Sequence, residues 1–296
     1  PKYFYDEAGS ALFEEITRQP EYYLTRTEAA ILEEWAPEIG ELMGESVTLV
    51  ELGSGSSRKT RILLKSLLHR REKLHYLPID ISSEILHETA SELDARYPAL
   101  QVTPIASPYE TGLSKASRLV ADEESPGGML VLFLGSSIGN MEPEEAVTFL
   151  TRIRRSLGRK DALLVGFDRV KDERTLNAAY NDARGVTAAF NLNLLARINR
   201  ELGGEFDLDR FSHLAFYDED RERIEMHLVS EARQEVRVGA LERSFALEPE
   251  ERIHTENSYK YTPARIADFG LRSRLRIAEL FSDEKDWFTL VLFVPA

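Results

Sequence analysis

The chain has 296 residues, 43% of them hydrophobic, which is enough for one α/β core with about a hundred residues left for a second lobe. The formal net charge of −14 repels nucleic-acid phosphates and anionic lipid surfaces, and no apolar run reaches the roughly 20 residues that span a bilayer. The chain has no cysteine, and its six histidines lack metal-ligand spacing. We therefore expect a cytoplasmic protein without a metal, with neither nucleic acid nor a membrane as a partner.

Short apolar runs alternate with amphipathic stretches in the first half of the chain, which predicts a parallel sheet covered by helices. The predicted strands are residues 47–52, 75–80, 101–105, 129–134 and 162–167. Two later runs, 275–280 and 287–294, are joined by a short acidic loop and predict a final antiparallel hairpin. Because ligands bind beyond the carboxyl ends of the strands in such sheets, function is expected at those turns.

The pattern changes between residues 169 and 260 without a flexible linker. Long helices are predicted over 172–202, and they are followed by four short predicted strands, 214–217, 224–231, 234–238 and 241–247. We interpret this region as an inserted α+β lobe. The predicted domains are therefore a sheet domain of residues 27–168 with 261–296, and a lobe of residues 1–26 with 169–260.

The strongest local motif is Glu51-Leu52-Gly53-Ser54-Gly55, after one predicted strand and before a helix at 60–68. Its glycines let the backbone turn tightly and approach a ligand closely, although a plain tight turn is the alternative for the motif alone. Asp80 ends the next strand, where its carboxylate can accept hydrogen bonds from ribose hydroxyls. The alternative is an Asp80 that only caps the following helix, but the Ser82 side chain could do that instead. Together these features predict an adenosine-binding site.

The spacing of the glycines bears on the choice of cofactor. The motif lacks the third spaced glycine of dinucleotide-binding loops, which favours S-adenosylmethionine (SAM) and disfavours a nicotinamide-dependent dehydrogenase. Lys59 either meets the methionine carboxylate or is solvated at a helix start. Tyr109, after Pro108, either stacks on the adenine or plugs the edge of the core.

Five segments, read together, resemble the histidine-specific Nα-methyltransferases that form hercynine in ergothioneine biosynthesis. They are residues 4–10, 17–26, 51–60, 134–140 and 255–260. The resemblance covers essentially the whole chain. It implies an α/β fold, a seven-stranded Rossmann-like class I methyltransferase sheet with an inserted α+β substrate lobe. It also implies SAM as cofactor and trimethylation of L-histidine, and we expect a monomer.

The resemblance also implies roles for individual residues. Tyr22, Asn140 and Tyr180 are implied to hold the substrate carboxylate. Tyr5 and Asn140 would lie near the α-amino group and are the candidate catalytic residues. The remaining implied substrate contacts are the imidazole clamp Glu256 and Ser258, the backbone of Gly135, and Met226 in the side-chain pocket. The implied cofactor positions are Gly53, Lys59, Asp80, Pro108 and Tyr109, of which Pro108 and Tyr109 depart from the acidic–aromatic pair of some relatives.

Simpler interpretations exist for several of these residues. Tyr22 could pack ahead of a helix that Thr25 and Glu28 cap, and Asn140 could be a turn residue. Among functions, the alternatives are N-methylation of tryptophan or another indole amino acid, and a binding module without turnover. An indole pocket would be expected to replace the carboxylate of Glu256 with an apolar side chain.

Overall fold

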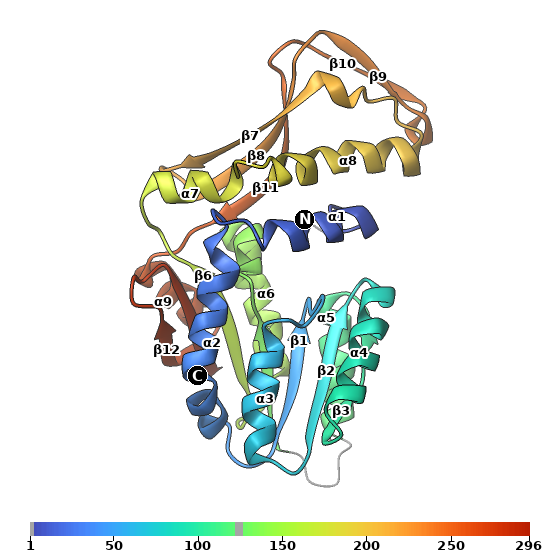
Figure 1. Cartoon of the computed structure of the whole chain (residues 1–296). Helices are drawn as coiled ribbons and strands as arrows, with labels where there is room; N and C mark the ends of the chain where they lie inside the picture. Colours follow the sequence, from blue (N-terminus) through green and yellow to red (C-terminus); the bar gives the residue numbers. More distant parts are fainter. Residues whose placement is uncertain (1–2, 122–126) are drawn as a thin grey trace. The chain divides into compact units, whose positions relative to one another are not determined.

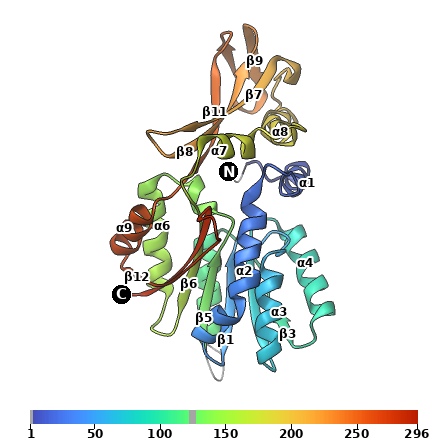
Figure 2. The same ribbon diagram turned by 60° about the vertical axis from the view of Figure 1, so that its left-hand side comes forward.

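A computed structural model describes residues 3–121 and 127–296 of the chain. It divides into two compact units, which are described separately (Figures 1 and 2). We call Arg26–Arg169 with Tyr261–Ala296 the sheet unit, and Pro1–Thr25 with Val170–Lys260 the insert unit. Among the described residues, no helix is both long and apolar enough to cross a membrane.

The sheet unit is built on a sheet with strand order β12-β13-β6-β5-β1-β2-β3, in which β4 also pairs with β2. The strands are β1 (Val47–Leu52), β2 (Leu74–Asp80), β3 (Leu100–Val102), β4 (Ile105–Ala106), β5 (Gly128–Phe133), β6 (Ala162–Asp168), β12 (Leu275–Ser282) and β13 (Phe288–Pro295). β13 runs antiparallel to both β6 and β12, and the other pairs are parallel. The α/β class and the final hairpin are therefore confirmed.

One strand position differs from the sequence prediction. The run predicted as a single strand, 101–105, is divided into β3 and β4, which pair with different parts of β2. Pro104 lies between them and has no N–H to donate to the ladder. The sheet thus keeps seven strand positions, with the third one broken at proline.

Helices cover both faces of this sheet. They are α2 (Tyr23–Leu42), α3 (Thr60–Arg70), α4 (Ser83–Arg96), α5 (Tyr109–Ala121), α6 (Pro143–Ser156) and α9 (Pro263–Arg272). In Figure 2, α6 and α9 lie on one side of the sheet and α2, α3 and α4 on the other. Every residue of β1, β5 and β6 is buried, as expected for strands covered on both faces.

The strand order determines where ligand-binding loops can meet. β1 lies between β5 and β2, and the chain runs outward from β1 to β3 before it returns to β5 on the other side. This change of direction is the switch point at which open α/β sheets bind ligands. Gly53 and Gly135 follow β1 and β5, and Asp80 is the last residue of β2, so three adjacent strands present predicted site residues at one edge.

The insert unit combines helices with short antiparallel sheets. Its elements are α1 (Glu7–Ile16), α7 (Glu173–Tyr180), α8 (Val186–Leu202), β7 (Phe211–Asp218), β8 (Arg223–Ser230), β9 (Gln234–Val238), β10 (Arg243–Leu247) and β11 (Arg252–Tyr259), with short 3-10 turns η2 (Leu208–Arg210) and η3 (Gly239–Leu241). β8 is the central strand of a sheet ordered β11-β8-β7, and β9 pairs with β10. The long helices predicted over 172–202 are α7 and α8, and Gly185, between them, adopts a left-handed conformation (φ 70°).

Candidate cofactor and substrate sites

The glycine loop after β1 requires glycine at its first position. Gly53 has φ 75°, and its N–H donates to the Ile79 carbonyl at 2.8 Å. A Cβ at this position would lie 2.7 Å from the Tyr109 hydroxyl. Gly55 follows with φ 47°, and its N–H donates to Asp80 Oδ2 at 2.9 Å. The loop is therefore tied to the ends of both β1 and β2.

Asp80 organises this loop while keeping capacity for a ligand. Its Oδ2 accepts from Gly55 N–H, and its Oδ1 accepts from Ser82 N–H at 3.0 Å. The expectation that the Ser82 side chain caps the next helix is wrong, because Ser82 is the N-cap of α4 but makes no capping hydrogen bond. A carboxylate has about four acceptor sites, so two remain for a pair of ribose hydroxyls.

Tyr109 packs beneath the glycine loop. Its ring makes an edge contact with Phe133 (centroid separation 5.7 Å) and a tilted contact with Phe149 (6.1 Å). Burial, and then the negative charge of Asp80, raise the pKa of Tyr109 to about 12, so the phenol keeps its proton. Pro108 is exposed just before α5. This geometry gives Tyr109 a packing role, and adenine stacking stays a prediction.

Lys59 is paired with a buried carboxylate. Its ammonium forms an ion pair with Glu28, whose side chain is fully buried. Both Glu28 oxygens also accept the Gly135 N–H, at 2.8 and 2.9 Å. Lys59 lies at the start of α3, as one interpretation expected, but it is paired with Glu28 and only partly solvated. The helix cap formed by Thr25 and Glu28 is wrong, because α2 begins at Tyr23 and Glu28 lies inside it. Glu28 thus joins the start of α3 to the turn after β5.

Sequence reasoning assigned no role to Glu28, but a signal for it exists. Glu28 lies on the same helical stripe as the buried residues Ile31, Leu32, Ala36 and Ile39. A carboxylate on the apolar stripe of a helix must be buried, and a buried charge needs a partner.

A second buried carboxylate, Glu51, supports the loop from below. Thr60 donates to its Oε1 at 2.6 Å, and the Tyr76 hydroxyl donates to its Oε2. Burial raises the pKa of Glu51 to about 7, although both hydrogen bonds act in the opposite direction. Glu51 therefore changes its charge near neutral pH.

The turn after β5 holds Gly135 and Asn140. Gly135 and Ser136 both adopt left-handed conformations (φ 77° and 54°), and the 3-10 turn η1 (Ser137–Asn140) follows. The Ser136 hydroxyl accepts from Asp168 N–H at 2.9 Å, which fixes the turn to β6. Asn140 is the half-buried last residue of this turn.

In the insert unit, an aromatic chain links three predicted substrate residues. Tyr5 packs edge-on against Phe13 (5.6 Å), Phe13 against Tyr22 (6.3 Å), and Tyr22 against Tyr180 (6.3 Å). Tyr22 and Tyr180 are buried, whereas Tyr5 is partly exposed. Segments far apart in sequence, the N-terminal residues and the end of α7, are thereby brought together.

Hydrogen bonds extend this row of aromatic side chains to β11. The Tyr180 and Ser258 hydroxyls are 2.7 Å apart. The Lys260 ammonium donates to Tyr180 at 3.0 Å and to Ser258 at 2.9 Å. Lys260 is fully buried, and its ammonium also lies over the Tyr180 ring. Lys260 belongs to a matching motif segment, but sequence reasoning gave it no role.

A bulge in β11 determines which face Glu256 occupies. His254 pairs with His227, but the register then shifts, so that Glu256 pairs with Met226. Directly paired residues point to the same face, so Glu256 shares a face with Met226 and, two residues on, with Ser258. The Thr255 hydroxyl donates to the Met226 carbonyl at 2.9 Å at the bulge. The implied imidazole clamp and its pocket residue thus lie on one face.

Three side chains that the sequence spacing did not connect lie together on the opposite face of β8 and β11. Ligand atoms of Glu225, His227 and His254 lie within 4.8 Å of one another, the one such group in the part of the chain that the structure describes. Glu225 Oε1, however, accepts from Arg223 Nε at 2.9 Å, and Oε2 contacts His227 Nε2 at 3.0 Å. Burial alone would raise the pKa of Glu225, but these hydrogen bonds lower it to about 2. Because Arg223 already neutralises the Glu225 carboxylate, we interpret this group as part of the contacts between β8 and β11 and not as a metal site.

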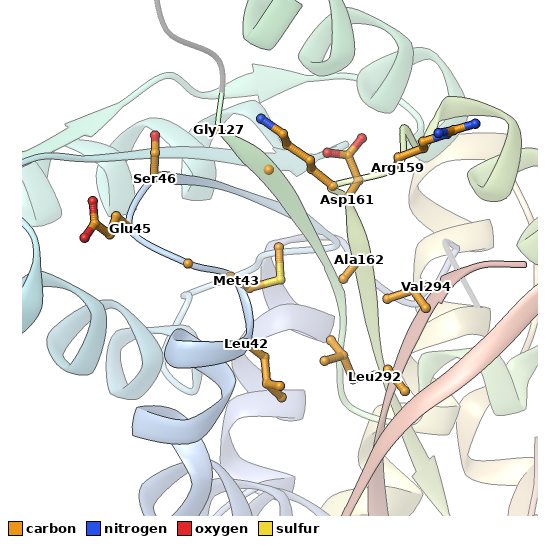
Figure 3. A pocket seen from close by; sticks show the side chains of 14 residues that line it. Leu42, Met43, Glu45, Ser46, Gly127, Arg159, Asp161, Ala162, Leu292 and Val294 are labelled. Atoms are coloured by element: carbon orange, nitrogen blue, oxygen red, sulfur yellow. The ribbon is translucent and has the colours of Figure 1, made fainter.

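A separate hollow of about 690 Å³ lies at the other edge of the sheet (Figure 3). It is lined by the end of α2, the starts of β5 and β6, and the end of β13, including Met43, Asp161 and Val294. None of the predicted site residues lines it. It lies at the amino ends of the parallel strands, away from the edge where open α/β sheets bind ligands.

The sheet with its antiparallel final pair, and the glycine loop tied to an aspartate on the next strand, define a class I methyltransferase domain. The family model described as "Histidine-specific methyltransferase, SAM-dependent" matches residues 1–295. The chain belongs to this family.

The names of similar proteins agree with this family. A histidine N-alpha-methyltransferase of Mycolicibacterium smegmatis is 44% identical, with 92% of this chain and 84% of that protein covered. An ergothioneine biosynthesis protein 1 of Neurospora crassa is 33% identical over 87% of this chain and 29% of its own length. A 4-dimethylallyltryptophan N-methyltransferase of Claviceps purpurea is only 26% identical over 61% of this chain and 54% of its own length. A solved structure of a possible exported protein from Bordetella parapertussis matches with a TM-score of 0.52 at 11% identity. The match covers 94% of this chain and 71% of that protein's chain, and it shows a similarity of fold alone.

Proposed function

We propose that this protein transfers methyl groups from SAM to the α-amino nitrogen of L-histidine, forming hercynine in ergothioneine biosynthesis. Family membership and the relatives' names support this activity. The observation that carries the choice of substrate is the common face of Met226, Glu256 and Ser258. A carboxylate and a hydroxyl satisfy both ring nitrogens of an imidazole, whereas an indole has one N–H and leaves an acceptor unused, which costs about 1–3 kcal/mol.

The cofactor assignment is supported by the loops of the sheet unit. Asp80 retains acceptor sites for ribose hydroxyls, Gly53 allows close approach, and Lys59 offers a cation near Gly135. We propose that these residues, with Pro108 and Tyr109 beside them, hold SAM. Bound SAM supplies an electrophilic methyl group on its sulfonium.

The proposed substrate roles follow the family resemblance. Tyr22, Asn140 and Tyr180 bind the carboxylate, the Gly135 backbone and Tyr5 contact the amine region, and Glu256 and Ser258 bind the ring. Asn140 and Tyr5 are uncharged, so they orient the α-amino group without stabilising its protonated form as a carboxylate would. Methyl transfer then depends mainly on holding the neutral amine in line with the methyl group. Repetition of this step adds up to three methyl groups.

The activity is tested by mass spectrometry of purified protein incubated with SAM and a panel of free amino acids. The expected product is histidine carrying up to three methyl groups on its α-nitrogen, with tryptophan unchanged. Methylation of tryptophan alone, or of no amino acid, contradicts the proposal. Glu256→Ala is expected to lose histidine turnover, while Glu235→Ala, which removes an exposed strand glutamate of the same unit, is the matched control.

We also propose that the protein works as a monomer in the cytoplasm. Sedimentation that gives the 33.7 kDa mass supports the monomer, and a mass twice as large contradicts it.

A further inference from the structure

The N-terminal segment is attached to α8 by side chains that none of the roles proposed above uses. α1 and α8 lie side by side within the insert unit (Figures 1 and 2). The Phe4 ring is buried and stacks on Phe190 at a centroid separation of 4.8 Å. The Arg197 guanidinium donates to the Tyr3 carbonyl at 2.9 Å. The two residues before Tyr5 are therefore fixed on α8.

Asp6, the residue after Tyr5, makes the polar part of this attachment. Its Oδ1 accepts from the Gly9 N–H at 2.8 Å, which caps α1, and from the Asn193 side-chain amide at 2.9 Å. Its Oδ2 forms an ion pair with Arg200. Burial alone would raise the pKa of Asp6, but the hydrogen bonds from Gly9, Arg200 and Asn193 lower it. The carboxylate is therefore ionised at neutral pH, and it joins α1 to α8.

The partners of Asp6 on α8 are not needed to cap α1. An N-cap side chain accepts from a backbone N–H in the first turn of its helix, and the Gly9 hydrogen bond fulfils this role. Asn193 and Arg200 lie on the same face of α8 as Phe190, because the three residues are spaced three and seven positions apart along the helix. Asp6 thus binds the face of α8 against which the neighbouring aromatic rings pack.

This attachment bears on where the Tyr5 side chain lies. The Tyr5 ring makes edge contacts with Phe13 of α1, at 5.6 Å, and with Phe190 of α8, at 5.9 Å. Asp6 is bonded to the backbone of α1 and to side chains of α8, so it holds together the two helices that the ring contacts. Tyr5 is partly exposed. Because packing does not enclose the ring, the position of its backbone helps to determine where its hydroxyl lies.

We propose that Asp6, held by Asn193 and Arg200, is a positioning residue that fixes Tyr5 on α8 so that the Tyr5 hydroxyl meets the α-amino group of the substrate. The inference rests on the proposed function, in which Tyr5 contacts the amine region, and it adds the residues that orient this contact. Methyl transfer depends on the placement of the amine, and a displacement of about 1 Å costs about 100-fold in rate. The proposed imidazole clamp is carried by β11, which none of these three hydrogen-bonding contacts reaches. Loss of the attachment therefore lowers kcat and leaves KM for histidine nearly unchanged.

Asp6→Ser separates the cap from the attachment. Serine caps helices about as well as aspartate, but its side chain is shorter and has no charge to pair with Arg200. With saturating SAM, this variant should lower kcat for histidine about tenfold and change KM less than about threefold. Asp172→Ser is the matched control, because Asp172 caps α7 of the same unit by accepting from the Thr175 N–H at 2.9 Å. The control should keep kcat within about twofold of the wild type.

A double-mutant cycle with Tyr5→Phe distinguishes positioning of Tyr5 from a general effect on the fold. If Asp6 acts through the Tyr5 hydroxyl, Asp6→Ser should lower kcat less than about twofold further once that hydroxyl is absent. An equal loss in both backgrounds, or a higher KM at unchanged kcat, overturns the inference. If Asp6→Ser does not fold, Arg200→Met replaces it in the cycle, because Arg200 is exposed on α8. Its loss of about threefold in kcat should likewise disappear in the Tyr5→Phe background.

The outcomes also separate this inference from the proposed function. No methylation of histidine by the wild type overturns the proposed function and this inference with it. A Tyr5→Phe variant as active as the wild type overturns the role of Tyr5 and this inference, while the activity stands. A loss of kcat in Tyr5→Phe together with wild-type kcat in Asp6→Ser overturns this inference alone.

Discussion

The Glu28–Lys59 ion pair makes a quantitative prediction, because its two partners differ in burial. The Glu28 side chain is fully buried, whereas 21% of the Lys59 side chain is exposed. In Glu28→Gln, the amide oxygen can still accept the Gly135 N–H, and the unpaired Lys59 ammonium can reach water. In Lys59→Met, by contrast, a buried carboxylate loses its cation.

The two variants should therefore be unequally destabilised. Removing the cation from a buried carboxylate costs about 3–5 kcal/mol. Glu28→Gln should cost about 1–2 kcal/mol, because the charge that it leaves is partly hydrated and the backbone donor stays satisfied. The double variant leaves no unpaired charge, so it should be more stable than Lys59→Met alone, with a coupling energy of about 1–3 kcal/mol.

The assay is urea unfolding of the wild type, both single variants and the double variant, followed by circular dichroism at neutral pH. Equal slopes across the four proteins license comparison of their free energies of unfolding. The reasoning is refuted if Glu28→Gln is the more destabilising single change, or if the two changes add within about 0.5 kcal/mol.

Three further predictions concern the glycine loop and the residues that contact it. Asp80→Asn removes charge-assisted acceptors, so it should weaken S-adenosylhomocysteine binding about 10- to 100-fold in calorimetry. Unchanged binding would show that Asp80 only holds the glycine loop in place. Burial raises the pKa of Glu51 to about 7, so the folded state holds a proton that the unfolded state has lost. Stability should therefore fall by up to about 3 kcal/mol between pH 4.5 and 7, and Glu51→Gln should remove this component of the slope in urea titrations at several pH values. Gly53→Ala, at φ 75° and 2.7 Å from the Tyr109 hydroxyl, should cost about 1–3 kcal/mol. Combining it with Tyr109→Phe should recover part of that loss, and no recovery would assign the cost to backbone strain alone.

The sheet was readable from sequence because its signals are local. Runs such as those that form β1 and β5 are apolar throughout, as strands covered on both faces must be. The glycine loop was also predictable, since its two glycines lie between a predicted strand and a predicted helix. The one error in strand position was local too, because Pro104 divided the third strand.

Side-chain partners were harder to predict. Capping rules suggested that Ser82 caps α4 and that Glu28 caps α2, but Asp80 binds the Ser82 N–H and Glu28 lies inside its helix. Lys59 was left between a ligand and water, and the structure pairs it with Glu28. The Lys59–Glu28 pair joins groups 31 residues apart, which local propensity does not contain. Asp80 and Ser82 are only two residues apart, and there the backbone N–H was bonded by a different side chain from the one that capping rules favour.

The sequence by itself determined the α/β class, the glycine loop with its aspartate on the next strand, and the family, because these depend on residue type and spacing along the chain. The tertiary structure decided which charged groups meet in the interior. It also decided which face Glu256 occupies, because a one-residue bulge at Thr255 moves its pairing partner from Glu225 to Met226. Side chains alternate along a strand, so this single shift turns Glu256 from the Arg223 face to the Ser258 face. Register depends on the neighbouring strand, and only the folded chain supplies that neighbour.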